Sequence, residues 1–175
     1  MNNLKSKCLN GCLAEGTILT MADGNKQRIE EVKIGDMVAI PDARAKRIVD
    51  IYTGYEEKIS ELKLVNGIIL KATSNHPIMT EKGHKRLKEL NPLDKVVIRE
   101  NQLESIEIIA EVEADTRVYN VLLEEMSTII CNDIWVGDFQ VQNNLESTRY
   151  RNNERINEIE TEMKKLMDEL EKLKG

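Results

Sequence analysis

Aromatic residues, cysteines, histidines and long hydrophobic runs are all scarce in this sequence. Aromatic residues make up 3% of the 175 residues and hydrophobic residues 41%, so aliphatic side chains must fill any core. No apolar run approaches the roughly 18 residues that are needed to span a bilayer. The N-terminal residues also lack the apolar centre of a secretory signal. We therefore expect a soluble, cytoplasmic protein without membrane contact.

Positive charge and metal-binding residues are equally limited. The formal net charge is −6, which argues against a nucleic-acid binder that relies on phosphate contacts. The cysteines Cys8, Cys12 and Cys131 are odd in number and show no repeated spacing, so they predict no disulfide framework. Together with His76 and His84 they form no recognisable zinc pattern. We expect no metal and no cofactor.

From residue 12 to residue 136, short alternating segments are separated by turn residues. Turns are indicated at Asp23-Gly24 and Asn66-Gly67, each next to an alternating run. Many short strands at this spacing predict an all-β fold that is compact and non-repetitive. The strand-like runs cover residues 16–40, 46–55, 59–73, 94–100, 104–114, 116–123 and 127–137.

The sequence changes character after Phe139. Residues 139–148 are polar and predict a linker, whereas residues 149–175 predict a highly charged helix. The apolar residues of this helix alternate in steps of three and four, which is the spacing of a coiled-coil seam. Such a narrow stripe needs a partner. It can pair with a second copy of the chain or fold back onto the β-domain, and we favour a homo-oligomer. The seam residues are Ile156, Ile159, Met163, Leu166, Leu170 and Leu173.

Cys12 stands directly after Gly11, at the start of the strand-rich region. Taken alone, a cysteine near a strand start is most often a small buried hydrophobic residue. A second segment contains Thr73 and His76, followed at once by Pro77. Taken alone, that segment indicates a turn in which the histidine binds nearby carbonyl groups. The combination of the two segments favours chemistry over packing.

Three segments, in order along the chain, resemble the Hint family, which comprises Hedgehog autoprocessing domains, inteins and bacterial intein-like domains. The opening block of the family resembles residues 12–38, CLAEGTILTMADGNKQRIEEVKIGDMV. The Thr-x-x-His block resembles residues 73–83, TSNHPIMTEKG, and the closing blocks resemble residues 118–138, VYNVLLEEMSTIICNDIWVGD. The resemblance implies an all-β Hint fold over residues 12–138, preceded by a short flanking segment, residues 1–11.

The resemblance also implies a self-cleavage reaction. In this family the first residue of the domain is a nucleophile, so Cys12 would attack the carbonyl of Gly11 and convert the amide to a thioester by an N–S acyl shift. His76 would bind the scissile amide nitrogen as general acid. Thr73 would hold the peptide in a strained geometry and stabilise the oxyanion. The resemblance implies that the substrate is the chain's own N-terminal segment and that the reaction would be a single autocatalytic turnover.

Several positions depart from the family pattern. Splicing inteins end in His-Asn followed by a cysteine, serine or threonine, whereas this chain has Gly137, Asp138 and Phe139. Asp138 does not readily form the succinimide that releases the chain, and Phe139 has no nucleophile, so we expect N-terminal cleavage without full splicing. Asn120 stands where the family often has aspartate and Ser127 where it often has histidine. Asn120 can orient groups by hydrogen bonds but cannot take a proton. We therefore treat Asn120, together with Asp138 at the end of the domain, as an auxiliary candidate.

The remaining cysteines and histidine have competing interpretations. Cys131 fits a buried core position, but it could also form a redox-sensitive disulfide with Cys12 that silences it. Cys8 fits an exposed, incidental residue or an unusual acyl acceptor. His84 fits a structural residue without a catalytic role.

A second function is compatible with the same residues. The chain can be a processing-inactive Hint fold that serves as an assembly module through its helical tail. A cysteine protease that acts on other proteins is a weaker third candidate, because nothing in the sequence suggests a substrate cleft.

Overall fold

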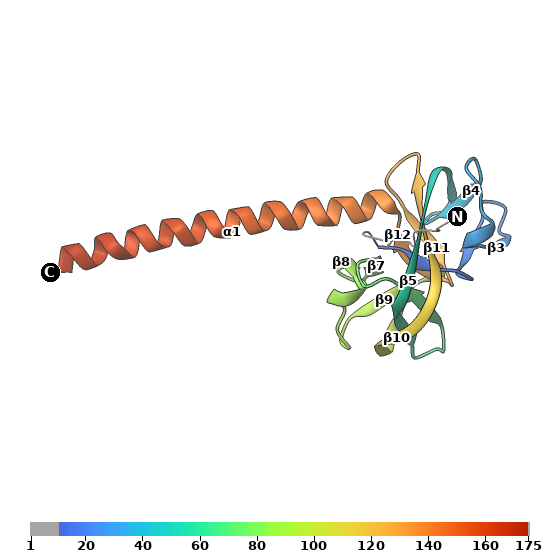
Figure 1. The fold of residues 1–175 in the computed structure, drawn as a ribbon, viewed down its shortest axis with the longest axis horizontal. Coiled ribbons are helices and arrows are strands. Elements are labelled where there is room, and N and C mark those ends of the chain that lie inside the picture. The colour runs from blue at the N-terminus through green and yellow to red at the C-terminus, as the bar shows by residue number, and fades with distance from the viewer. Residues whose placement is uncertain (1–10, 175) are drawn as a thin grey trace, which may run out of the picture. The chain divides into compact units, whose positions relative to one another are not determined.

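The computed structural model describes residues 11–174, apart from the side chains at positions 149 and 150, and it contains an all-β domain and one long helix (Figure 1). Every strand pairing in this part of the chain is antiparallel. The strands are β1 (Leu13–Ala14), β2 (Ile18–Thr20), β3 (Lys26–Arg28), β4 (Met37–Ile40), β5 (Arg44–Leu64), β6 (Ile69–Ala72), β7 (Pro77–Thr80), β8 (Gly83–Arg86), β9 (Lys95–Ile98), β10 (Gln102–Leu123), β11 (Thr128–Cys131) and β12 (Ile134–Gly137). Short 3-10 helices cover Ile29–Glu31, Leu87–Glu89 and Arg99–Asn101, and the long helix is α1 (Phe139–Lys174).

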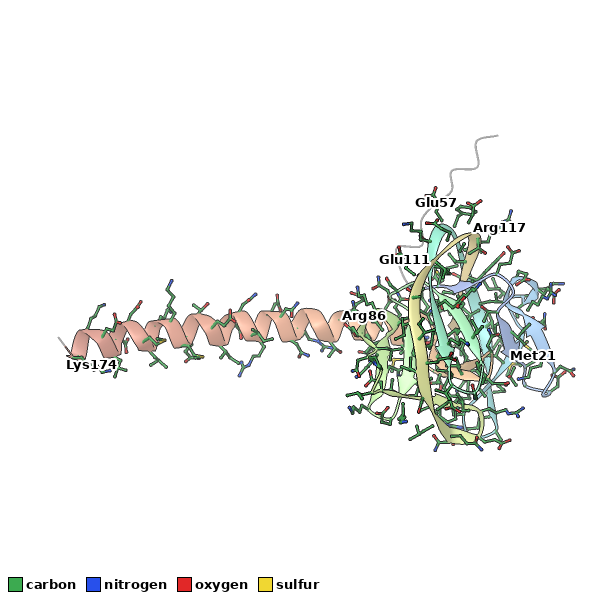
Figure 2. The ribbon with its side chains drawn as sticks, turned by 90° about the horizontal axis from the view of Figure 1, so that it is seen from below. Met21, Glu57, Arg86, Glu111, Arg117 and Lys174 are labelled. Atoms are coloured by element: carbon green, nitrogen blue, oxygen red, sulfur yellow. The ribbon has the colours of Figure 1, made fainter. Side chains whose placement is uncertain are left out.

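The two longest strands form a continuous ribbon that the sequence did not predict. β5 and β10 have 21 and 22 residues and pair along most of their length (Figure 1). The break that we expected at residue 115 is a bulge, where the pairing register shifts and Asp115 has a φ of 47°. Around this bulge the exposed face is charged, with Glu57, Glu111 and Arg117 among its side chains (Figure 2). Backbone hydrogen bonds therefore keep β5 and β10 paired through a stretch whose charged residues are more typical of a loop.

The short strand β1 lies between β6 and β10, and this position governs the candidate site. Leu13 of β1 is opposite Ala72 on one side and Tyr119 on the other. Because the strands are antiparallel, the residue before Leu13 lies beside the residues that follow these two partners. The sheet thus brings position 12 next to positions 73 and 120, which are far apart in the sequence.

Aliphatic side chains fill the core, as the composition predicts. The main cluster of buried residues consists chiefly of leucine, isoleucine and valine, and among the described residues Tyr119 is its one aromatic member. Cys131 belongs to the same cluster and is fully buried, which confirms its interpretation as a core residue. A smaller cluster contains Cys12, Ala14 and Val118.

The helix begins at Phe139, so the predicted linker over residues 139–148 is wrong. This stretch contains no glycine or proline that would break a helix. The Asp138 carboxylate accepts a hydrogen bond from the N–H of Val141, and the Asp138 carbonyl accepts one from the N–H of Gln142. The first contact satisfies the N–H of Val141, which otherwise has no partner within the helix, and the second is the first regular hydrogen bond of the helix. A buried cap, rather than an amphipathic repeat, fixes where α1 starts.

Contacts within the chain divide it into two compact units at Gln142. The first contains the β-domain and the first turn of α1, and the second contains the rest of the helix. In the second unit every predicted seam residue is exposed, from 45% at Ile159 to 85% at Leu173. Over residues 11–174, no helix is both long and apolar enough to cross a membrane.

Candidate functional site

A side chain from β10 and one from the residue directly after β6 contact both polar atoms of the Gly11–Cys12 peptide bond. The amide nitrogen of Cys12 donates a hydrogen bond to Thr73 Oγ1 at 2.7 Å, and the carbonyl oxygen of Gly11 accepts one from Asn120 Nδ2 at 2.6 Å. The backbone N–H of Thr73 also donates to the Cys12 carbonyl at 2.8 Å, which extends the pairing of β1 with β6. The peptide is therefore held at the nitrogen and the oxygen where charge changes during acyl transfer.

These contacts are distributed differently from those that the family resemblance implies. Thr73, expected at the oxyanion, contacts the amide nitrogen, whereas Asn120, expected as an auxiliary, contacts the carbonyl oxygen. The cause is strand geometry. The N–H of residue 12 and the carbonyl of residue 11 point to opposite sides of β1, one toward β6 and the other toward β10.

Close packing at Gly11 leaves no room for a side chain. A Cβ at this position would lie 2.5 Å from the Cα of His76 and 2.8 Å from the carbonyl carbon of Asn75. Both are backbone atoms, so rotation of a side chain cannot relieve the clash. Glycine therefore allows the peptide to approach His76 more closely than any other residue would.

His76 is a fully buried, neutral imidazole beside this peptide. Its backbone N–H donates to the Thr73 carbonyl at 3.0 Å, and this turn delivers the ring just before β7. Burial lowers the pKa of His76 to about 4, while the nearby Gly11 carbonyl opposes that shift and His84 adds to it. Among the described residues neither ring nitrogen meets the distance and angle of a full hydrogen bond, although the Gly11 backbone lies close enough to favour the protonated ring. Burying a polar group without a partner costs folding free energy. The position of the His76 ring beside the Gly11–Cys12 peptide makes it an acid–base candidate.

Cys12 is buried and disulfide-bonded in the structure. Its side chain lies in the smaller apolar cluster with 1% exposure. Cys131 is free, so the alternative in which these two cysteines form a disulfide with each other is wrong. Burial raises the pKa of the Cys131 thiol, which keeps it neutral and unreactive. Cys8 lies outside the described residues. A nucleophilic role for Cys12 requires that its disulfide be reduced first.

Asp138 stabilises the fold at the C-terminal end of the β-domain. Its carboxylate accepts hydrogen bonds from the N–H groups of Val141, Leu123 and Ser127 at 3.0, 3.3 and 3.4 Å. Burial raises the pKa of this carboxyl group, and the hydrogen bonds from backbone N–H groups oppose the shift. Asp138 therefore caps α1 and holds the connection between β10 and β11, where we expected an auxiliary to the reaction.

His84 joins two strands of the β-domain through its ring. Its Nε2 lies 3.1 Å from Thr128 Oγ1, which connects β8 to β11, and burial lowers its pKa. This contact agrees with a structural role. Within residues 11–174, histidine, cysteine and acidic side chains form no group of three or more that could hold a metal ion.

Gln142 is a site residue that the sequence did not indicate. It is 2% exposed, and its Oε1 accepts a hydrogen bond from Asn120 Nδ2 at 3.1 Å. The polar run after Phe139 lacks periodicity, so the sequence predicts that Gln142 lies in a linker. The available signal was the aspartate at position 138, which is a favourable N-cap residue directly before a stretch free of glycine and proline.

The β-domain has the Hint fold of inteins, as comparison with solved structures shows. A DnaB intein from Synechocystis sp. PCC 6803 is 22% identical over 73% of this chain and 98% of that chain, with a TM-score of 0.65. A bacterial intein-like domain from Clostridium thermocellum is 23% identical over 73% of this chain and 98% of that chain, with a TM-score of 0.65. The gp41-1 intein is 18% identical over 72% of this chain and 97% of that chain, also with a TM-score of 0.65. No protein-family model matches the sequence, and no curated protein matches it. The predicted Hint fold is thus confirmed at the level of structure.

Proposed function

We propose that this chain is an intein-like autoprocessing domain that cleaves itself at the Gly11–Cys12 bond. The observation that carries this proposal is the set of contacts to that peptide. Thr73 and Asn120 bind its nitrogen and its oxygen, and His76 packs against its glycine. A structural peptide at a strand start needs neither side-chain contact, and it needs no buried imidazole without a full hydrogen bond.

The reaction begins with a reduced Cys12. Its thiol loses a proton to solvent, and the thiolate attacks the Gly11 carbonyl carbon, so that a C–S bond forms and the carbonyl π electrons move onto oxygen. Asn120 Nδ2, already 2.6 Å from that oxygen, stabilises the negative charge. The C–N bond then breaks, and the Cys12 nitrogen takes up a proton and leaves as an amine. The product is a thioester between Gly11 and Cys12 Sγ.

His76 is the general acid in this proposal. With a pKa of about 4, about one ring in a thousand is protonated at pH 7, so its imidazolium form is scarce but strongly acidic. Thr73 Oγ1 holds the amide N–H at 2.7 Å and so fixes the direction in which the nitrogen lone pair develops. Water or an added thiol then attacks the thioester carbonyl and releases the N-terminal segment with Gly11 at its end.

The opposite end of the domain supports cleavage without splicing. Both carboxylate oxygens of Asp138 accept hydrogen bonds from backbone N–H groups, and this engagement favours a structural role over attack on its own carbonyl. The ring of Phe139 stacks on Tyr52 of β5, with centroids 4.3 Å apart and an interplanar angle of 21°. The bond between Asp138 and Phe139 thus leads into a capped helix and carries no following nucleophile.

A second candidate function is a processing-inactive Hint fold that assembles through its helix. The exposed seam of α1 and the disulfide at Cys12 favour it. In that case Cys12→Ala changes neither the processing nor the assembly of the protein, whereas a charged residue in the seam disrupts assembly.

Intact mass spectrometry distinguishes the two functions. The full chain is reduced with a phosphine and incubated with a small thiol at neutral pH. We expect wild type and Cys131→Ala to lose residues 1–11 as the thiol's thioester, and Cys12→Ala to keep its full mass. Wild-type protein that retains its full mass after long incubation would contradict the autoprocessing proposal.

A further inference from the structure

Gln142 connects the first turn of α1 to the scissile peptide through a single intermediate side chain. Asn120 Nδ2 donates both to the Gly11 carbonyl oxygen at 2.6 Å and to Gln142 Oε1 at 3.1 Å. Both side chains are buried, with Asn120 at 1% and Gln142 at 2% exposure. The amide of Asn120 is thus shared between the scissile peptide and the helix.

The hydrogen bonds of Asn120 fix the direction of its amide group. Its nitrogen donates to two acceptors, and its Oδ1 accepts from the N–H of Val121 at 2.9 Å. A flipped amide would place Oδ1 against the two acceptor oxygens and the NH2 group against a donor. Without the acceptor of Gln142, one buried N–H loses its partner and the preference for the donating orientation weakens.

The helix cap holds Gln142 in place. The N–H of Gln142 donates to the Asp138 carbonyl at 3.2 Å, and the neighbouring Val141 packs against Gly137, where a Cβ would lie 2.5 Å from Val141 Cγ1. The first turn of α1 is therefore fixed to the β-domain by backbone and by close packing. A side chain on such a turn is well suited to orient a partner within a fraction of an ångström.

We propose that Gln142 is a positioning residue for the self-cleavage reaction, and that it holds the Asn120 amide as the donor to the Gly11 carbonyl oxygen. This inference rests on the proposed function. It makes the first turn of α1 part of the reactive unit, beyond the end of the Hint domain. The helix therefore contributes to the N-terminal reaction through its first turn.

The test compares Gln142→Met with Gln140→Met in the full chain. Methionine keeps an unbranched side chain of similar length but offers only a weak acceptor. Gln140 lies in the same turn and donates from Nε2 to the Leu123 carbonyl at 2.7 Å, so its variant controls for the loss of a hydrogen bond near the cap. We expect thiol-induced cleavage to slow about tenfold in Gln142→Met and to stay within about twofold of wild type in Gln140→Met. In an Asn120→Ala background, Gln142→Met should add less than about a twofold effect, because the two residues act as one unit.

A second readout does not depend on cleavage. The Cys12→Ala substitution creates the one Gly-Ala dipeptide of the chain, because every other glycine that has a following residue precedes a residue other than alanine. Labelling glycine carbonyls with 13C and alanine nitrogens with 15N therefore selects the Gly11 carbonyl by NMR in this background. We expect Gln142→Met to move this carbonyl resonance upfield, as its hydrogen bond weakens, and Gln140→Met to leave it unchanged.

The two readouts separate the possible failures. An unchanged carbonyl resonance, together with wild-type cleavage in Gln142→Met, overturns the positioning role and leaves the proposed function intact. A shifted resonance in a protein that never cleaves overturns the proposed function and supports the contact between Gln142, Asn120 and Gly11. An unchanged resonance in a protein that never cleaves overturns both.

Discussion

The two ends of the Hint domain are built in opposite ways. At the N-terminal end, side chains bind the Gly11–Cys12 peptide itself, and an imidazole beside it makes no full hydrogen bond among the described residues. At the C-terminal end, the hydrogen bonds of Asp138 serve backbone N–H groups and a helix cap. At the N-terminal end, polar side chains face a peptide bond whose atoms change charge in an acyl transfer. At the C-terminal end, the Asp138 carboxylate and its backbone partners already satisfy one another's hydrogen bonds.

A glycine at each end illustrates the difference. The missing Cβ of Gly11 faces the backbone of His76, while that of Gly137 faces the side chains of Val141 and Pro77. Both positions are tightly packed, but one brings a peptide to a buried imidazole and the other lets a helix start against the sheet. One fold can thus hold one terminal peptide beside a buried imidazole and build the other into a helix start.

Gly11→Ala should have the largest effect on the reactive end. The new Cβ would meet the His76 backbone at 2.5 Å, so the peptide must move away from Thr73 and Asn120. A displacement of about 1 Å reduces such reactions about 100-fold. The rate of thiol-induced cleavage, followed by intact mass, measures this loss.

Gly137→Ala is the matched control for that substitution. Its clash falls on Val141, so it should lower the melting temperature more than Gly11→Ala does and slow cleavage less. Equal cleavage rates in wild type and Gly11→Ala would show that the close approach to His76 is irrelevant to the reaction.

The buried histidine should make stability depend on pH. Its pKa falls from 6.5 in the unfolded chain to about 4 in the folded protein, so between these values the unfolded state binds more protons. Stability therefore decreases as the pH falls through this range, by about 3 kcal/mol in total. Denaturant unfolding of wild type and His76→Gln at several pH values measures the difference. Parallel pH profiles for the two proteins would place the histidine in a solvated site instead.

Asp138→Ala should destabilise the other end by about 2 kcal/mol, since it removes the helix cap and leaves buried N–H groups without an acceptor. Asp138→Asn keeps one acceptor oxygen and should cost about 1 kcal/mol. It also supplies the asparagine that splicing inteins use, yet we expect no product cut after residue 138, because the bond leads into the cap of α1. Chemical denaturation and intact mass check the two expectations. A fragment beginning at Phe139 would mean that the helix start does not protect this bond.

Leu166→Glu should have the smallest effect on both ends. Leu166 is 60% exposed in the second unit of the chain, so cleavage should not change and unfolding of the β-domain should shift by less than about 0.5 kcal/mol. We propose that the seam pairs with a second copy of this chain, and sedimentation should therefore show loss of an oligomer in this variant. Lys164→Glu, outside the seam, is the control. A wild-type protein that sediments as a monomer at all concentrations would contradict the pairing.

Much of the reactive end could be predicted from short motifs taken together. Cys12 follows Gly11, and Thr73 precedes His76 by three residues. Taken alone, each motif favours packing or a turn, and only the resemblance of three ordered segments to the Hint family selected these four residues. The contact of Asn120 with the carbonyl oxygen depends on the register of β1 between two strands, which no local pattern specifies. The sequence therefore indicated most of the site residues but not Gln142, and it placed Thr73 at the carbonyl oxygen, whereas Thr73 binds the amide nitrogen and Asn120 binds the oxygen.

The capped end and the long ribbon were less predictable. The start of α1 depends on tertiary contacts of Asp138 and on the stacking of Phe139, and polar residues after it lack a helical repeat. For the same reason Gln142 was missed. The continuity of β10 depends on backbone pairing through a bulge at Asp115, where the sequence pattern changes as it would at a turn.

The most direct test of this account is a single mass-spectrometric map of both ends after reduction and thiol treatment. We predict one product that begins at Cys12 and runs without a break through Asp138 and Phe139 to the last residue, and none of it in Cys12→Ala. A chain cut after Asp138, or a reduced wild type that yields no fragment beginning at Cys12, would contradict the claim that one end of this domain reacts and the other is built into its fold.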